Sequence, residues 1–326
     1  MISKPLALSL FVVFLLGFVA LVQWRAAARE ASVEAQYPPS GQFIEVDGTR
    51  IHLKITGQGP DIVLIHGASG SLRDFTFDLV GRLEDSYRVI AVDRPGLGWS
   101  ERPPGYGGVF NTAAEPPAMQ ARLLQAATDA VGVENPIVLG HSFGGAIALA
   151  WALERPDQTA GLVLTAAASN PWEGELGWLY RVNSRIFGSA VVIPLITAFT
   201  PHDYIEETVA EIFAPQSPPN GYMKHFGTDM TLRRETMRAN AQQVNALKPY
   251  VREMSKRYPT LDLPVESVHG TADDTVPIKV HAEPLLNQIP GAQLDRLEGV
   301  GHMPHHSNTE AVLAAIDRVA VRAGLR

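Results

Sequence analysis

The chain of 326 residues contains no cysteine, which excludes a thiol nucleophile, a disulfide framework and thiolate metal ligands. Charged residues are also scarce, at 19%, and the net charge is −7. Because proteins that neutralise nucleic-acid phosphates are usually basic, this composition argues against a nucleic-acid partner. Hydrophobic residues make up 46% of the chain, so it is not intrinsically disordered. The composition predicts a globular protein with a large core.

Charge is entirely absent from residues 6–24. This apolar run is long enough to predict a membrane-spanning helix, so we interpret residues 1–25 as an N-terminal, single-pass membrane anchor. A cleaved secretory signal, leaving a secreted or periplasmic protein, is the alternative, although the apolar part of a signal is usually shorter. The basic residues on the two sides nearly balance and indicate no orientation. Residues 26–41 show no useful periodicity and are predicted to form a linker.

From residue 42 onward, short apolar runs alternate with helical patterns. An Asp-Gly pair between residues 42–46 and 49–56 predicts a β-hairpin. The near-continuous apolar runs are typical of strands buried on both faces of a parallel sheet. This alternation predicts an α/β fold with a doubly wound, mostly parallel sheet. The predicted buried strands are 61–65, 87–92, 136–139, 161–165, 264–268 and 293–297, and the predicted helices are 72–83, 119–131, 143–153, 278–289 and 309–321.

One stretch, residues 169–259, interrupts the alternation. It contains no clear buried strand, is rich in aromatic residues and is broken repeatedly by proline. We expect a mainly helical cap inserted over the carboxyl edge of the sheet, where open α/β sheets bind their ligands. The predicted core then consists of residues 42–168 and 260–326.

The composition of this cap bears on the substrate. Its aromatic residues suggest an apolar substrate portion, although packing within the cap is the plainer interpretation. Arg233, Arg234 and Arg238 share a predicted cap helix. The simplest interpretation is that these arginines form a solvated helix face. The alternative is that they contact an anionic substrate or a lipid headgroup.

The motif with the clearest chemical meaning is Gly140-His141-Ser142-Phe143-Gly144, a match to G-x-S-x-G. A predicted strand leads into it and a predicted helix leaves it, which is the strand–turn–helix context of a nucleophile elbow. Such a turn exposes the serine hydroxyl, and the helix N-terminus favours a developing anion. A glycine-rich turn with an incidental serine is the alternative.

A serine hydroxyl is a weak nucleophile near neutral pH and needs a base and an orienting acid. In the chain order Ser, Asp or Glu, His, both lie downstream of Ser142. Asp273 and Asp274 lie on one predicted loop after a strand, and His302 follows the last strand. His269 precedes the acid loop and is out of order for the base. No H-E-x-x-H pattern occurs, so we predict no metal site and no cofactor.

Over about residues 42–323, the chain resembles the α/β-hydrolase fold family in its capped branch. The resemblance is carried by His66-Gly67, Asp93–Ser100, the serine elbow, the acid loop and Gly301-His302. Its implied roles are Ser142 as nucleophile, His302 as base, Asp273 as acid with Asp274 as the fallback, and the backbone N–H groups of Phe143 and Ala68 as the oxyanion hole. Epoxide hydrolases and haloalkane dehalogenases share the Asp93–Ser100 region, but they have an aspartate nucleophile where this chain has serine.

The expected function is therefore that of a serine hydrolase, which cleaves an ester or related acyl bond of an apolar small molecule through an acyl-enzyme. The alternatives are a non-hydrolytic ligand-binding member of the same fold, and a lyase, peptidase, perhydrolase or carbon–carbon bond hydrolase with the same site. The expected partners are the acyl substrate and, through the N-terminal helix, a membrane. The oligomeric state is left open.

Overall fold

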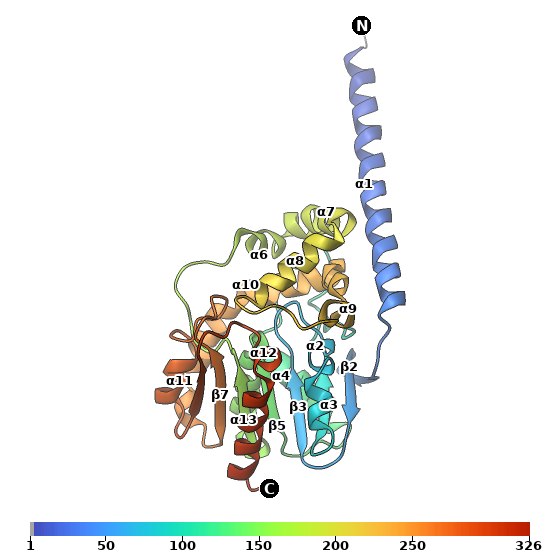
Figure 1. The fold of residues 1–326 in the computed structure, drawn as a ribbon. Coiled ribbons are helices and arrows are strands. Elements are labelled where there is room, and N and C mark those ends of the chain that lie inside the picture. Colours follow the sequence, from blue (N-terminus) through green and yellow to red (C-terminus); the bar gives the residue numbers. More distant parts are fainter. Residues whose placement is uncertain (1–2) are drawn as a thin grey trace.

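The computed structural model describes residues 3–326 and contains one eight-stranded sheet (Figure 1). The strand order is β1-β2-β4-β3-β5-β6-β7-β8. The first two strands form the predicted antiparallel hairpin, β2 pairs antiparallel with β4, and all later neighbours are parallel. The strands are β1 (Gln42–Val46), β2 (Thr49–Thr56), β3 (Asp61–Ile65), β4 (Arg88–Val92), β5 (Ile137–His141), β6 (Gly161–Thr165), β7 (Val265–Gly270) and β8 (Gln293–Leu297). The predicted α/β fold is confirmed.

Helices cover both faces of this sheet. One face packs on α4 (Pro117–Asp129), α5 (Phe143–Glu154) and α11 (Ala282–Gln288). The other face packs on α2 (Arg73–Thr76), α3 (Leu79–Leu83) and α13 (Thr309–Arg322). Because both faces are covered, β5 and β6 are buried along their whole length, as their apolar runs predict.

The prediction of one helix over residues 72–83 is wrong. The chain forms α2 and α3 there, with a break at Asp78, whose φ of −142° and ψ of −52° are not helical. Aspartate competes with the helical backbone for hydrogen bonds and therefore favours helix starts over helix interiors. The break directs the first turn, α2, toward the centre of the molecule.

Residues 166–264, all of which the structure describes, form helices and loops without a strand. They lie above the carboxyl ends of the parallel strands (Figure 1). The helical character predicted for 169–259 agrees with this arrangement. The segments are α6 (Trp178–Asn183), η2 (Gly188–Val192), α7 (Ile193–Phe199), α8 (His202–Ile212), α9 (Tyr222–Phe226), η3 (Thr228–Leu232), α10 (Arg234–Ser255) and η4 (Tyr258–Thr260).

The N-terminal helix α1 (Lys4–Gln36) is longer than predicted, so the expected irregular linker over 26–41 is wrong for residues 26–36. This stretch is rich in alanine, glutamate and arginine, which are good helix formers. It also buries Ala26 and Val33, so packing supports the helix. The helix ends just before two consecutive prolines, and residues 37–41 are irregular.

Candidate active site

The serine of the elbow stands at a sharp turn between β5 and α5. Ser142 has φ of 52° and ψ of −117°, a conformation that non-glycine residues rarely adopt. Its neighbours hold it there, since its N–H donates to the Thr165 carbonyl at 3.0 Å and its own carbonyl accepts from Ala168 at 3.0 Å. The turn needs small residues on both sides, because a Cβ on Gly140 would overlap the Gly144 carbonyl and one on Gly144 would overlap the Ile65 carbonyl. This crowding is the physical reason for the G-x-S-x-G spacing.

Replacing Gly144 with alanine is therefore expected to destabilise the fold. The new methyl group meets backbone of β3, which cannot move as a flexible side chain does, and overpacking of this kind costs about 1–3 kcal/mol or more. Gly81→Ala in α3 is the matched control, since its Cβ would meet nothing within 4 Å and alanine favours a helix. Urea unfolding of both variants measures the difference. An unchanged stability of Gly144→Ala would contradict the packing described for the elbow.

The structure brings Ser142, His302 and Asp273 together from three separate loops. The Ser142 hydroxyl oxygen lies 3.0 Å from His302 Nε2, and His302 Nδ1 lies 2.8 Å from Asp273 Oδ2. All three residues are buried, with Ser142 the most exposed at 8%. With Nδ1 protonated and donating to the carboxylate, Nε2 is free to accept the serine proton. The three side chains therefore form a hydrogen-bonded chain of a nucleophile, a base and an acid that orients the base.

Asp273 is held as a carboxylate by several donors. Its Oδ1 accepts the backbone N–H groups of Thr275 and Val276 at 2.9 and 2.8 Å. Burial raises the pKa of Asp273, but hydrogen bonds from His269, His302 and the Val276 N–H outweigh burial and lower the pKa well below its usual range. The neighbouring Asp274 is exposed. The sequence pattern left open which of the two loop carboxylates is the acid. In the structure, the two carboxylates lie in different environments.

His269 is a contact of the acid that the sequence analysis set aside. It lies one residue before the end of β7, and its Nε2 lies 3.3 Å from Asp273 Oδ2 and 2.7 Å from the Val276 carbonyl. Chain order excluded it from the base position but said nothing about a supporting role. The sequence signal that could have indicated this contact was the position of His269 near the end of a predicted strand, directly before the loop that carries the acid.

The two backbone groups expected to bind an oxyanion both lie beside Ser142. Phe143 begins α5, so its N–H belongs to the first helical turn, where intrahelical acceptors are missing. The loop that contains Ala68 is also close, because a Cβ built on Gly67 would lie 3.1 Å from Ser142 Cβ. The start of α5 and the loop that contains Gly67 and Ala68 therefore both lie close to the serine.

Arg94 is a further residue of this region that pattern reasoning missed. It is fully buried, donates to the Gly67 carbonyl at 2.9 Å and lies 3.9 Å from the centre of the Phe143 ring. Gln243, on α10, accepts another of its hydrogen bonds at 2.6 Å. Burial lowers the pKa of Arg94 to about 9, so it still carries its charge near neutral pH. Arg94 connects both loops around the serine with the helices above them.

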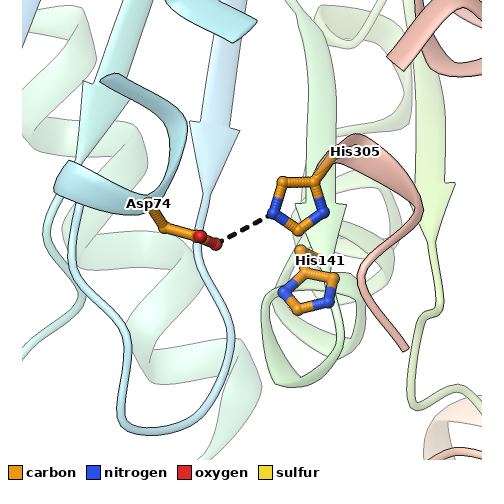
Figure 2. A group of neighbouring side chains, drawn as sticks. All are labelled: Asp74, His141 and His305. Carbon is orange, nitrogen blue, oxygen red and sulfur yellow. Dashed lines mark hydrogen bonds and ion pairs between the residues drawn. The ribbon is translucent and has the colours of Figure 1, made fainter. Parts of the chain in front are cut away.

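A second buried polar cluster lies behind His302. Asp74 Oδ2 accepts from His305 Nε2 at 3.0 Å, and Asp74 Oδ1 accepts from His306 Nε2 at 2.8 Å. The Tyr222 hydroxyl donates to the same carboxylate at 2.7 Å. Figure 2 shows Asp74 pointing at His305, with the His141 ring next to it. His141 Nε2 in turn lies 3.0 Å from the His302 carbonyl. The cluster joins α2, α9 and the loop that carries His302.

Three side chains of this cluster lie close enough together to raise the question of a bound metal ion. Within residues 3–326, Asp74, His141 and His305 are the group whose ligand atoms all lie within 4.8 Å of one another. However, the carboxylate and His305 are already hydrogen-bonded to each other, and His141 Nε2 contacts the His302 carbonyl. These contacts are those of a hydrogen-bond network, so we assign no metal to it.

Replacing Asp74 with asparagine is expected to lower the free energy of unfolding by about 3 kcal/mol at neutral pH, because two buried histidines lose their shared carboxylate. Burial raises the pKa of Asp74, but its histidine partners lower it well below the usual range. The stabilisation is therefore present above about pH 4 and lost as the pH falls through the folded-state pKa.

Urea unfolding at several pH values measures both effects. Asp78→Asn, at a half-buried position on the same segment where the carboxylate pairs with the exposed Arg82, is the control and should change the stability by less than about 0.5 kcal/mol. Equal effects of the two substitutions would contradict the role of the Asp74 cluster.

The three cap arginines do not form a free solvated face, so that interpretation is wrong. Arg233 lies 3.1 Å from Glu34, and Arg234 lies 2.6 Å from Glu30. Arg238 is buried and contacts Ser189 and Glu235. Two of the three therefore pair with acidic residues of α1, which sequence periodicity could not place near the cap.

Comparison with known proteins identifies the family of this chain. Residues 62–315 match the Alpha/beta hydrolase family. Haloalkane dehalogenase 2 of Mycobacterium tuberculosis is 26% identical over 286 residues, which cover 86% of this chain and 94% of that protein.

Two solved structures show the same fold. The esterase RhEst1 from Rhodococcus sp. ECU1013 has a TM-score of 0.62 at 24% identity and covers 86% of this chain and 98% of that one. A membrane phospholipase A described as a bacterial virulence factor has a TM-score of 0.65 at 23% identity and covers 97% of this chain and 99% of that one. The family match and the dehalogenase relative support hydrolase activity, and the two solved structures support the fold. The chain belongs to the alpha/beta hydrolase family.

Proposed function

We propose that this chain is a serine hydrolase that cleaves an ester or related acyl bond through a Ser142–His302–Asp273 triad. The observation that carries the proposal is the hydrogen-bonded sequence from the Ser142 hydroxyl through His302 to Asp273, at 3.0 and 2.8 Å. The residue at the elbow is a serine, so an ester hydrolase is favoured over the aspartate-based chemistry of a dehalogenase.

The proposed mechanism has two stages. His302 Nε2 takes the hydroxyl proton while the Ser142 oxygen attacks the acyl carbonyl carbon, and the protonated ring then gives the proton to the leaving alcohol. Water, deprotonated by His302, attacks the acyl carbon, the bond to the Ser142 oxygen breaks, and the ring returns its proton to that oxygen as the carboxylic acid leaves. Asp273 fixes the ring tautomer and stabilises the imidazolium, while the Phe143 and Ala68 N–H groups stabilise the oxyanion.

The proposed organisation is a hydrolase core over 42–168 and 260–326 and a cap over 169–259. The cap contacts the site through Gln243, whose side-chain oxygen accepts a hydrogen bond from Arg94. The cap therefore sets the shape of the acyl pocket, and we propose an apolar small-molecule ester as the substrate class. A ligand-binding protein of the same fold, with an intact serine but no turnover, is the second candidate.

We also propose that α1 remains attached as a membrane anchor. It is one continuous helix of 33 residues whose first part is apolar and exposed. Its last part is paired with the cap, since Arg29 lies 2.5 Å from Asp229 and Glu30 lies 2.6 Å from Arg234. Cleavage near residues 26–28 would leave Arg29 and Glu30 on the chain but would remove the turn before them, including Val22, which is buried against Ala198 of the cap. This packing favours an anchor over a signal.

The test is hydrolysis of p-nitrophenyl esters of increasing acyl length by the full chain, together with labelling by a fluorophosphonate probe. The expected results are labelling by the probe and ester hydrolysis whose rate is highest at one acyl chain length. Labelling without turnover of any ester would favour the ligand-binding candidate or another acyl substrate. A folded protein that shows neither reaction would contradict the proposal.

A further inference from the structure

The anchor helix is held against the cap along its last third. Val22 and Ala26 are buried together with Ala198 of α7. Arg29 also donates to the Thr200 carbonyl at 2.6 Å, and Arg234 donates to Gln23 at 2.5 Å. The chain after α1 is bound as well, because the Trp99 indole donates to the Tyr37 carbonyl at 3.0 Å. These contacts fix the direction in which α1 leaves the body, so the helix is not a flexible tether.

The length of the free part of α1 then sets the height of the cap relative to a membrane. Burial of α1 begins at Val22, and residues 4–21 are exposed. At about 1.5 Å per residue, these residues extend about 27 Å, close to the hydrocarbon thickness of about 30 Å. The end of α7, which contacts α1 beside Trp24, therefore lies at the boundary between hydrocarbon and headgroups.

The part of the cap at this level is unusually apolar on its surface. Beyond α1, seven of the eleven exposed large apolar side chains of the described chain lie between residues 178 and 204. Trp178 and Phe187 are 64% and 66% exposed. The helices that carry this patch lie at the end of the body from which α1 projects (Figure 1). We call these seven residues the apolar cap face, and they are Trp178, Leu179, Ile186, Phe187, Val191, Phe199 and Tyr204.

The charges of this region suit a lipid surface. Residues 177–199 contain Arg181 and Arg185 but no acidic residue, although the whole chain is acidic. Arg181 pairs with Glu175 just before this stretch, and Asp203 adjoins Tyr204, so Arg185 is the cation of the stretch without an acidic neighbour in the sequence. Aromatic side chains and arginines are the groups that settle at the headgroup level of a bilayer. An exposed apolar patch of this kind on a monomer marks a contact surface.

The same segment reaches the proposed catalytic site. Tyr180, next to the exposed Trp178 and Leu179 on α6, contacts Asn240 and Ser69 with its hydroxyl. Asn240 and Ser69 are hydrogen-bonded to each other at 2.7 and 2.8 Å, and Ser69 follows Ala68. The short helix α6 therefore carries part of the apolar cap face and also contacts the loop proposed to bind the oxyanion.

We propose that the apolar cap face lies in the interfacial layer of the membrane that α1 spans. The proposal rests on α1 being an uncleaved anchor, as proposed above. Lipid is the occupant of this face because the docked helix brings it to the membrane boundary, and interfacial elements bury their apolar side chains about 5–10 Å into that layer.

The absence of cysteine makes a direct test possible. Single cysteines are introduced at Phe14, Phe187 and Val321 of the full chain, and each is labelled with a small environment-sensitive fluorophore. Phe14 lies within the free part of α1, and Val321 is exposed on α13, at the opposite end of the molecule (Figure 1). The proteins are reconstituted in phosphatidylcholine–phosphatidylglycerol vesicles that contain a nitroxide quencher either near the headgroup or deep in the acyl chain.

The label at residue 187 should lose about half of its fluorescence to the shallow quencher, and less to the deep one. The label at residue 14 should respond more to the deep quencher, and the label at residue 321 to neither. If residue 187 behaves like residue 321 while residue 14 is quenched, the membrane contact of the cap is overturned and the anchor stands. If residue 14 is not quenched either, the anchor itself fails, and this proposal fails with it.

Discussion

Replacing Ser142 with alanine is expected to lower kcat/KM for ester substrates by about 10⁴- to 10⁶-fold. The hydroxyl that attacks the acyl carbon is lost, and no other nucleophile lies within hydrogen-bond reach of His302 Nε2 in the described chain. The residual rate reflects only substrate binding and the oxyanion donors. Steady-state hydrolysis of p-nitrophenyl esters measures the effect.

The fold of this variant should be intact, because Ser142 is held by its backbone hydrogen bonds to Thr165 and Ala168, which alanine retains. Its thermal unfolding should therefore match that of the wild type. Ser86→Ala, at an exposed position, is the matched control and should hydrolyse at the wild-type rate. Substantial ester hydrolysis by a folded Ser142→Ala variant would remove the serine from the mechanism.

The substitution Asp273→Asn is expected to have the second largest effect, a loss of about 10³- to 10⁴-fold in kcat. The amide keeps the volume of the side chain but presents a neutral group, and its NH₂ donor disfavours the tautomer of His302 that accepts the serine proton. The same change at the exposed Asp274 should alter kcat by less than about 2-fold. Measuring both variants separates the two neighbouring carboxylates directly. A larger loss from Asp274→Asn would show that the acid is misassigned.

The charge of Asp273 also has a signature in stability. Its pKa is lowered in the folded state, so ionisation contributes stability that is present above about pH 4 and is lost as the pH falls through the folded-state pKa. Acidification below pH 4 should therefore destabilise the wild type more than Asp273→Asn. Thermal unfolding across this range measures the difference, and parallel curves for the two proteins would contradict the described hydrogen bonds to the carboxylate.

The features that were predicted from the sequence are those set by residues close together in the chain. The glycines at 140 and 144 are required by backbone crowding within one turn, so the motif itself reports the local geometry of the elbow. The hairpin likewise follows from a two-residue turn. Apolar runs locate strands because both faces of the sheet are covered.

Contacts between distant segments could not be predicted in this way. The pairing of Asp74 with His305 joins residues 231 positions apart, and that of Glu30 with Arg234 joins residues 204 positions apart. Arg94 lies in the Asp93–Ser100 segment, which the sequence indicated only as part of the family resemblance, yet its guanidinium contacts Gly67 and Phe143 beside the serine. The helical extension of α1 depends on the cap, and no periodicity within residues 26–36 signals that partner.

The most direct test of the central claim is to identify the residue that forms the covalent adduct. The full chain is incubated with a fluorophosphonate, digested and analysed by peptide mass spectrometry. The account predicts a single modified residue, Ser142, and no adduct in Ser142→Ala. An adduct on a different residue, or an unmodified Ser142 in a protein shown to be folded, would contradict the assignment of this chain as a serine hydrolase.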